Sequence, residues 1–297
     1  MDNCCGAIHH RICAQPPEEI SAVTYMKFSI IMPLLNGAQF LPAAIASVQA
    51  QTERDWELII ADGGSTDGSV AIARELAEAD DRIRLFTEPD AGMYDALFKG
   101  LAQARGEWIG WLNSDDLYTS WALATIDEFT DHTECDWVTG VPACWDDKGR
   151  LRYLRPAGRY SQKRIAAGWH HDRLLGNLQQ ESIFFSRRLL ERLTPDETSQ
   201  IRKMKLAGDY YLWRRFARHA PLDVIPSVLG GFRRHEKNMS TVNAEDYRKE
   251  VMSTQPFTLP APLAQAAALL WRMRSSWELM RSANEADQKM QAQLRKR

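Results

Sequence analysis

Four short clusters of carboxylates, amides and glycines follow four apolar segments in the first 120 residues. In chain order the clusters occupy positions 33–36, 62–68, 88–95 and 113–116. Each cluster alone is typical of a turn, because Asp, Asn, Gly and Ser favour turn conformations. After four consecutive parallel strands, however, the clusters would meet at one edge of a sheet, where open α/β sheets bind ligands. We therefore expect a binding site at that edge.

The elements that must position these clusters alternate regularly. Apolar runs rich in β-branched and aromatic residues predict strands at 28–32, 56–61, 82–86 and 107–112. Pro33 is expected to end the first of them. Apolar residues at helical spacing predict helices at 38–51, 69–79 and 93–105. This rhythm predicts an α/β fold with a mainly parallel sheet flanked by helices. After position 121 it weakens, and we expect shorter strands at 137–141, 151–154, 182–185 and 221–232.

The chain lacks the two glycine signatures that commonly hold phosphates. No G-x-G-x-x-G follows the first strand, and no G-x-x-x-x-G-K-[ST] occurs. A divalent cation can hold a diphosphate instead, because Mg²⁺ typically binds one or two carboxylates plus substrate phosphates. Asp115 and Asp116, at the end of the fourth strand, have the chemistry for this role. The alternative is that they cap a helix at 117–129.

Composition excludes several classes of protein. The 297 residues are 44% hydrophobic and carry a net charge of −2, so neither whole-chain disorder nor a basic nucleic-acid-binding surface is expected. No apolar run approaches the roughly 20 residues that a membrane-spanning helix needs. The five cysteines follow no metal or disulfide spacing, which favours a cytoplasmic location. Residues 1–25 have no signal-peptide pattern, and we expect them to be a disordered extension.

The motifs quoted above resemble those of the family-two glycosyltransferases. The resemblance rests on Phe28–Asn36, Ala61–Ser69, Glu88–Ala96 and Trp111–Tyr118, and it covers about residues 27 to 240. It implies a GT-A fold, Rossmann-like, and a nucleoside-diphosphate sugar as donor. The expected organisation is a GT-A domain at 26–242 and a helical tail at 243–297. Within the domain, residues 26–120 would bind the nucleotide sugar, and residues 121–242 would bind the acceptor.

The resemblance also implies roles for individual residues on the donor side. Asp115 would bind Mn²⁺ or Mg²⁺ at the diphosphate, and Asp62 and the backbone near Pro33 would line the nucleoside. Two positions depart from the family pattern. The second carboxylate of the usual Asp-Asp-Gly-Ser turn is replaced by Gly63, and the first acidic position of the metal motif is Asn113. The remaining predicted donor-side residues are Asn36 at the end of the first strand, and Asp90 and Asp95 at the sugar or ribose.

The second half supplies candidates for the acceptor side. Gln180 and Glu181 enter an apolar strand, and Asp209 precedes Tyr-Tyr-Leu-Trp at the start of a predicted helix at 209–218. The resemblance makes Asp209 the catalytic base that removes a proton from the acceptor hydroxyl. The alternative is a helix cap. In the loop at 230–240, Arg234 or Lys237 would pair with phosphate and His235 would complete the metal shell; a solvated basic loop is the alternative.

The last segment is basic and amphipathic. From position 265 onward it holds seven Lys or Arg and three Asp or Glu, with apolar residues at steps of three and four. This pattern favours contact with an anionic membrane, or packing on the chain's own domain or on a second subunit. The resulting hypothesis is a metal-dependent, inverting glycosyltransferase that extends a glycan or lipid-linked acceptor, in the cytoplasm or at the inner membrane face. A nucleotidyltransferase and a non-catalytic sugar-nucleotide-binding protein are the alternatives.

Overall fold

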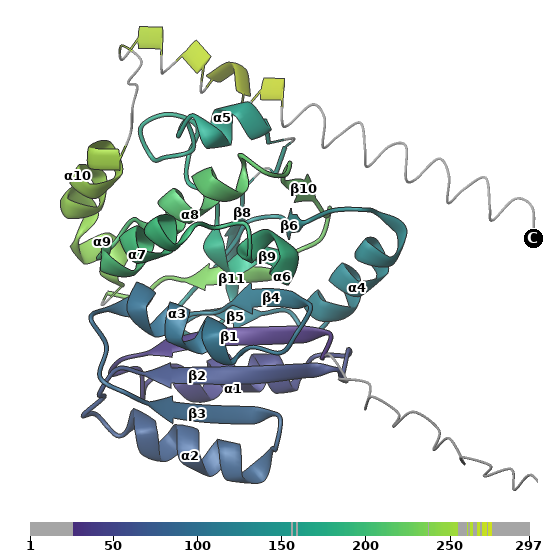
Figure 1. Ribbon diagram of the computed structural model, residues 1–297, viewed down its shortest axis with the longest axis vertical. Helices are drawn as coiled ribbons and strands as arrows, with labels where there is room; N and C mark the ends of the chain where they lie inside the picture. Colours follow the sequence, from purple (N-terminus) through teal and green to yellow (C-terminus); the bar gives the residue numbers. More distant parts are fainter. Residues whose placement is uncertain are drawn as a thin grey trace, which may run out of the picture.

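The computed structural model describes residues 26–155, 157–158, 160–236, 238–254, 260, 262–263, 266–267, 269–271 and 273–274. Within these residues eleven strands form two separate sheets. The larger has the order β10-β6-β9-β4-β1-β2-β3 and the smaller the order β5-β11-β7-β8 (Figure 1). The strands are β1 (Phe28–Leu34), β2 (Trp56–Asp62), β3 (Ile83–Thr87), β4 (Trp108–Trp111), β5 (Leu117–Tyr118), β6 (Trp137–Thr139), β7 (Ala143–Trp145), β8 (Leu151–Leu154), β9 (Ile183–Ser186), β10 (Asp223–Val224) and β11 (Gly230–Arg233).

The first four strands are parallel, as the sequence predicts. β1 pairs with β2 on one side and β4 on the other, and β2 pairs with β3. The larger sheet becomes mixed at β9, which is antiparallel to both β4 and β6. The carboxyl ends of β1 to β4 therefore lie at one edge, and the four polar clusters leave the sheet there.

Pro33 does not end the first strand, contrary to the sequence prediction. β1 continues through Pro33, which lies in register with Ala61 of β2. Proline lacks a backbone N–H and is normally excluded from central strands. It is tolerated in β1 because β4 pairs with that strand only as far as Ile31, so no ladder bond to β4 is lost.

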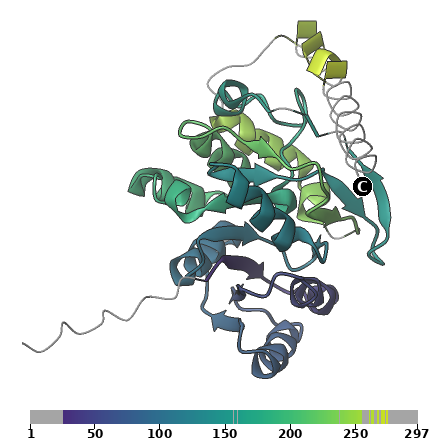
Figure 2. The ribbon, with the colours of Figure 1, turned by 90° about the vertical axis from the view of Figure 1, so that its right-hand side faces the viewer.

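Helices cover both faces of the larger sheet, and Figure 2 shows α1 and α3 on opposite sides. Alternate β1 residues, Phe28, Ile30 and Met32, pack with α1, α2 and α4, whereas Ile31 packs with α3, α7 and α8. The helices are α1 (Leu41–Gln49), α2 (Ser69–Ala79), α3 (Met93–Gln103), α4 (Ala122–His132), α5 (Gln162–Ala166), α6 (Arg187–Leu190), α7 (Pro195–Lys203), α8 (Gly208–Phe216), α9 (Met239–Val242) and α10 (Ala244–Thr254), with a 3₁₀ turn at Gln180–Ser182.

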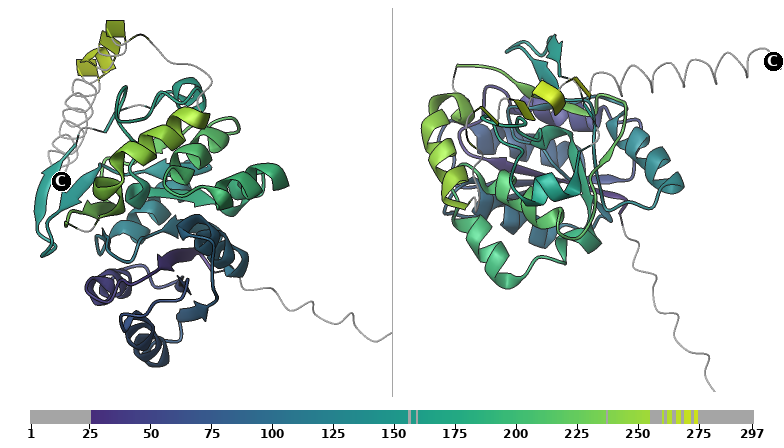
Figure 3. Two further views of the ribbon diagram at one scale, coloured as in Figure 1. Left: turned by 90° about the vertical axis from the view of Figure 1, so that its left-hand side faces the viewer. Right: turned by 90° about the horizontal axis from the view of Figure 1, so that it is seen from above.

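The helix proposed at 117–129 is present as α4, but it begins five residues later than proposed. Residues 117 and 118 form β5, and α4 begins only at Ala122, so Asp115 and Asp116 cap no helix. The strand with a turn proposed at 221–232 consists of two short strands, β10 and β11, which belong to different sheets. The smaller sheet contains β7, which the sequence did not predict, and its β7–β8 hairpin projects from the body (Figure 3).

Residues 1–25 and 275–297 lie outside the described part of the chain, so the predicted extension and most of the predicted tail are untested. The described tail residues include Trp271, which packs at ring-centroid distances of 6.0 Å from Tyr160 and 5.8 Å from His170. The tail therefore contacts its own domain at this point. Among the described helices, none combines the length and apolar content that crossing a bilayer requires.

A buried ion pair network holds the opposite end of the sheet. Glu57 of β2 is fully buried and accepts hydrogen bonds from Ser29, Arg84 and Arg105. Burial raises the pKa of this carboxyl, but the bonds from Arg105, Ser29 and Arg84 together outweigh burial and place the pKa below its ordinary value. Glu57 thus stabilises the fold only while it is ionised.

We expect Glu57→Gln to lower the free energy of unfolding by about 3 kcal/mol at neutral pH, because it leaves buried donors without a charged acceptor. The difference should shrink as the pH falls through the depressed pKa of Glu57, since the wild-type contribution is lost there. Urea unfolding at several pH values measures both effects. The exposed Glu88→Gln is the matched control; equal losses for the two variants would refute the role of Glu57.

Candidate functional site

Two loops at the carboxyl edge are joined by hydrogen bonds. Asn36, which follows β1 with a positive φ of 53°, accepts a bond from the backbone N–H of Thr66 at 2.8 Å. Asparagine is among the few residues that adopt this left-handed conformation readily. The backbone N–H of Asn36 donates to Ser65 Oγ, and that of Gly37 donates to Ser69 Oγ. The predicted donor-side residue Asn36 therefore forms hydrogen bonds that fix the loop after β2.

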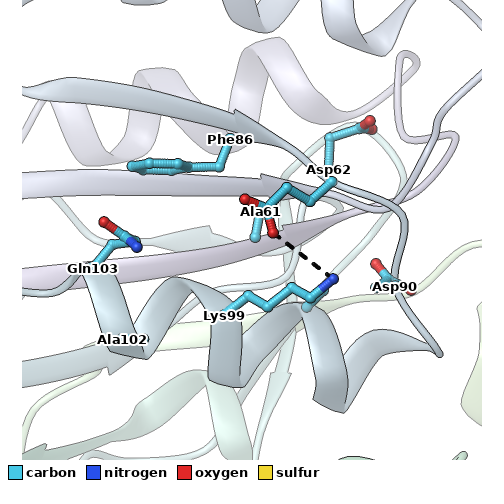
Figure 4. Close-up of a pocket in the computed structure, with 9 residues that line it drawn as sticks. Ala61, Asp62, Phe86, Asp90, Lys99, Ala102 and Gln103 are labelled. Atoms are coloured by element: carbon cyan, nitrogen blue, oxygen red, sulfur yellow. Dashed lines mark ion pairs between the residues drawn. The ribbon is translucent and has the colours of Figure 1, made fainter.

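Asp62 ends β2 and shapes the same loop. Its carboxylate is buried and accepts hydrogen bonds from the backbone N–H groups of Gly64 and Ser65. Next to it is a cavity of about 130 Å³ whose lining includes Asp62, Phe86 and Asp90. Figure 4 shows Asp62 and Asp90 at one end of this cavity, with Phe86 and Gln103 toward the other. Pro33 lies beside Ala61, a further lining residue, so these predicted nucleoside residues share one region.

Asp95 supports the loop before α3. Its carboxylate accepts two hydrogen bonds from Arg202 and one from the backbone N–H of Ala91 at 3.1 Å. Lys99 lies 3.7 Å from the same carboxylate. Burial raises the pKa of Asp95, but the hydrogen bonds from Arg202 and Ala91 lower it below the ordinary value. These contacts give Asp95 a role in positioning the loop that carries Asp90; its contact with a sugar or ribose stays a prediction.

Asn113, at the end of β4, is held between two elements. Its side-chain oxygen accepts a bond from Trp111 Nε1 at 2.9 Å, and its Nδ2 donates to Gln180 Oε1 at 3.0 Å. Gln180 in turn donates to the backbone oxygen of Trp111. The structure thus brings the predicted residues Asn113 and Gln180 together, although 67 positions separate them, and it fixes the amide of Asn113 in one orientation.

Asp115 and His235 meet at the proposed metal site. His235 Nε2 lies 2.9 Å from Asp115 Oδ2, and Asn238 Nδ2 lies 3.3 Å from that oxygen. The imidazole of His235 also stacks on Phe40, with ring centroids 4.4 Å apart. Within the described residues no three His, Cys, Asp or Glu side chains gather in a metal-binding arrangement. A carboxylate and an imidazole nevertheless fit a divalent cation that completes its shell with donor phosphates.

A buried carboxyl pair lies directly behind this site. Asp116 is fully buried, and its Oδ1 accepts a bond from the backbone N–H of Arg233 at 2.7 Å. Burial, with the charges of Glu181 and Asp115, raises the pKa of Asp116 well above its ordinary value. Burial also raises the pKa of Glu181, while a hydrogen bond with Asp116 opposes that rise. The pair therefore binds a proton at higher pH than two ordinary carboxyls would.

Arg233 and Arg234 occupy opposite environments. Arg234, the predicted phosphate partner, is exposed, whereas Arg233 is buried beside Asp116 and Phe40. Burial lowers the pKa of Arg233, and the charges of Asp116 and Asp115 oppose this change. Two nitrogens of Arg233, Nε and Nη2, have no hydrogen-bond partner in the described part of the chain. Sequence reasoning overlooked Arg233, because nothing in the sequence distinguishes the buried arginine that ends β11 from the exposed arginine that follows it. Lys237 lies outside the described residues.

Asp209 lies in the first turn of α8, where Ala207 is the N-cap residue, so the simple capping alternative fails. Burial raises the pKa of Asp209 to about 7, and the charge of Glu181 contributes to this rise. The hydroxyl of Tyr94 donates to the backbone oxygen of Leu206 at 2.7 Å and makes a longer, weaker contact of 3.4 Å with Asp209 Oδ1. The Tyr94 ring covers Gly208 so closely that a Cβ there would lie 2.7 Å from the ring, so only glycine fits. Sequence reasoning did not identify Tyr94.

The arrangement places one half-buried carboxyl with a near-neutral pKa in the same electrostatic cluster as Asp115 and Glu181. Such a carboxyl suits general base catalysis at neutral pH. The carboxylate and imidazole at Asp115 and His235 suit a cation, and the cavity beside Asp62 suits a planar, partly apolar group. Together these features indicate binding and activation of two substrates at the carboxyl edge of the sheet.

The protonation of Asp116 can be tested by substitution. We expect Asp116→Asn to change the free energy of unfolding by about 1 kcal/mol or less, because a neutral amide replaces a neutral carboxyl. Asp116→Ala should cost about 3 kcal/mol, because it leaves the Arg233 N–H and Glu181 without partners. Urea unfolding at neutral pH measures both. If the free energy of unfolding falls as far in the asparagine variant as in the alanine variant, the carboxyl of Asp116 is ionised.

Known proteins share both the sequence motifs and the fold. A glycosyltransferase of PGL/p-HBAD biosynthesis from Mycobacterium tuberculosis is 36% identical over 173 residues, which cover 57% of this chain and 62% of that protein, less than two thirds of its length. EpsJ of Bacillus subtilis, described as an uncharacterized glycosyltransferase, is 34% identical over 128 residues, covering 43% of this chain and 37% of EpsJ.

Among solved structures, Staphylococcus aureus TarS 1–349 with UDP-GlcNAc superposes with a TM-score of 0.60 at 16% identity, covering 82% of this chain and 70% of TarS 1–349. The mannosyltransferase PcManGT of Pyrobaculum calidifontis, in complex with GDP-Man and Mn²⁺, superposes with a TM-score of 0.57 at 18% identity. The match covers 89% of this chain and 77% of PcManGT. These neighbours establish the predicted GT-A fold. The sequence model of the family described as "Glycosyl transferase family 2" matches residues 29–194, which is more than half of the chain. The chain therefore belongs to that family.

Proposed function

We propose that this protein transfers a sugar from a nucleoside-diphosphate sugar to an acceptor hydroxyl with inversion at the anomeric carbon. The observation that carries the proposal is Asp209 in the first turn of α8, where burial raises its pKa to about 7 and the Tyr94 hydroxyl lies 3.4 Å from its Oδ1. An ordinary helix-terminal aspartate would titrate far lower. A base with a pKa near the working pH combines a usable deprotonated fraction with enough basicity to accept a proton.

In the proposed step, ionised Asp209 accepts the proton of the acceptor hydroxyl. At the same time the oxygen of that hydroxyl attacks the anomeric carbon of the donor sugar. The new carbon–oxygen bond forms on the face opposite the bond to the diphosphate, which breaks with its electron pair. The nucleoside diphosphate leaves, and the configuration at carbon inverts. One base suffices, because no covalent intermediate with the protein forms. Glu181, buried behind Asp209, raises the basicity of Asp209 through its charge.

Asp115 and His235 are proposed to hold a divalent cation, Mn²⁺ or Mg²⁺, at the donor diphosphate. Their 2.9 Å contact and the neighbouring Asn238 support this assignment. A bound cation would neutralise charge that develops on the leaving diphosphate. Arg233, with its unpartnered nitrogens, would add a second positive charge near Asp115. PcManGT is described with Mn²⁺ and GDP-Man, which is consistent with this proposal.

The acceptor is proposed to be a glycan or lipid-linked saccharide at the cytoplasmic membrane face, as in surface polysaccharide synthesis. Residues 143–173 support this, since they carry eight Lys or Arg and only three Asp or Glu in a chain of net charge −2. Every residue of β8 is exposed, Leu151 and Leu154 included. In the tail, Leu263, Leu270 and Met273 are exposed as well. Basic residues together with exposed apolar side chains favour contact with anionic lipid.

Of the alternatives, membership of the glycosyltransferase family disfavours a nucleotidyltransferase. A non-catalytic nucleotide-sugar-binding role would not require the raised pKa of Asp209. Turnover therefore distinguishes that role from catalysis.

We expect Asp209→Asn to lower turnover by about 100-fold or more while donor affinity stays nearly constant, because the amide accepts no proton. In the wild type, turnover should fall about tenfold for each pH unit below about 7, as Asp209 becomes protonated. Tyr94→Phe removes a hydrogen bond that lowers the pKa of Asp209, so this fall should begin at higher pH. Initial rates against pH measure both effects.

The same variant has an independent signature in stability. Because the pKa of Asp209 is raised in the folded state, ionising it costs stability as the pH rises through about 7. Asp209→Asn should therefore melt at a higher temperature than the wild type above that pH and show a smaller advantage at acid pH. Near-normal turnover in Asp209→Asn would contradict the assignment, and Glu181 would be the next carboxyl to substitute.

We expect Asp115→Asn to weaken nucleoside-diphosphate binding by about tenfold or more in the presence of Mn²⁺, because it removes a charged ligand. Without a divalent cation the two proteins should bind alike. Calorimetric titration of UDP and GDP with and without Mn²⁺ measures the difference. The exposed Asp81→Asn is the control, and unchanged Mn²⁺-dependent affinity in Asp115→Asn would exclude Asp115 from the metal site.

A further inference from the structure

The carboxylate of Asp90 lies where a side chain at position 63 would otherwise be. A Cβ placed on Gly63 would lie 2.7 Å from Asp90 Cγ and closer still to Oδ2. Real Cβ atoms essentially never come within 3.0 Å of such neighbours. Gly63 does not have a positive φ, so its backbone conformation does not demand glycine. The structural reason for glycine at position 63 is therefore the space taken by the Asp90 carboxylate.

This position of Asp90 is fixed by its own loop. Asp90 Oδ1 accepts a bond from the backbone N–H of Gly92 at 2.8 Å. Lys99 donates to the backbone oxygen of Pro89 at 2.6 Å, and Asp95 accepts from the N–H of Ala91. The loop is therefore anchored on both sides of Asp90, and the carboxylate is held against Gly63 rather than free in solvent.

One oxygen of this carboxylate remains available for a ligand. Asp90 Oδ2 accepts no hydrogen bond from the described residues, whereas both oxygens of Asp62 are occupied by the N–H groups of Gly64 and Ser65. Asp90 and Phe86 both line the cavity, and Figure 4 shows the Asp90 carboxylate at one end of it and the Phe86 ring toward the other. The cavity thus combines apolar surface for a planar ring with a carboxylate at its end.

We propose that Asp90, whose carboxylate occupies the space of a side chain at position 63, recognises the base of the donor nucleotide. A carboxylate oxygen accepts a hydrogen bond, so it favours a base with a ring N–H on its pairing edge. Uracil, thymine and guanine have that group, and neutral cytosine and adenine do not. The inference rests on the proposed use of a nucleoside-diphosphate donor, and it moves Asp90 from the sugar, where the sequence placed it, to the base.

The test compares binding of UDP, TDP, GDP, CDP and ADP by calorimetry with Mn²⁺ present. At least one of the first three should bind the wild type about tenfold more tightly than CDP and ADP, because a carboxylate hydrogen bond contributes about this much. Asp90→Ala should remove the preference. The matched control is Asp81→Ala, which alters an exposed carboxylate outside the cavity lining and should leave the preference intact.

Two further variants test the steric relation between the positions. Gly63→Ala should weaken binding of the preferred nucleotide about tenfold by displacing Asp90, yet have no effect in the Asp90→Ala background. The double variant Gly63→Asp with Asp90→Gly returns one carboxylate to the site and should recover most of the lost affinity. Melting temperatures confirm that each variant is folded.

The outcomes separate this inference from the proposed function. Tight nucleotide binding with no preference among bases, or an unchanged preference in Asp90→Ala, overturns the inference alone. The inference is also overturned if Gly63→Ala weakens nucleotide binding equally in the wild type and in the Asp90→Ala variant. Binding with the expected preference but no sugar transfer supports the inference and contradicts the proposed transferase reaction.

Discussion

The buried carboxyl of Asp116 joins the two sheets and so fixes the geometry of the site. It accepts the N–H of Arg233 in β11 and a longer bond from Asn113 at the end of β4. His235 and Asn238 follow β11 directly, and Asp115 precedes Asp116. One hydrogen-bonded group therefore sets the separation of Asp115 and His235, which come from chain segments 120 residues apart. Because Asp116 is fully buried, its orientation cannot relax into solvent.

Burial of several carboxyls in one place has a chemical consequence. Desolvation raises the pKa of Asp116, Glu181 and Asp209, and the charges of these neighbours add to the effect. Such clustering costs stability, and it is typical of sites where charge and protons are used. The contrast with Glu57 is informative. That carboxyl is equally buried, but two arginines hold its pKa low, and it serves the fold rather than chemistry.

The remaining side chains of the candidate site come from two parts of the fold. At the carboxyl edge of the larger sheet, Asn36 ties the loop after β1 to the loop after β2, and Asp62 and Asp95 each hold the backbone of one loop. Asp209 and Glu181 come from α8 and from the turn before β9. Preorganisation matters because a transferase must align two substrates before a bond can move between them.

The amino-acid sequence by itself determined the alternation of the first four strands and three helices, because periodicity and turn residues are local signals. It also placed the polar clusters at one edge, since parallel strands all end there. Only the tertiary structure decided that Arg233 and not Arg234 faces Asp116, that Asp209 touches Tyr94, and that Asp90 fills the space left by Gly63. Each of these depends on contacts between segments far apart in the chain, which no local pattern encodes. The burial that raises the pKa of Asp209 has the same origin, because desolvation is produced by packing and not by the neighbours in sequence.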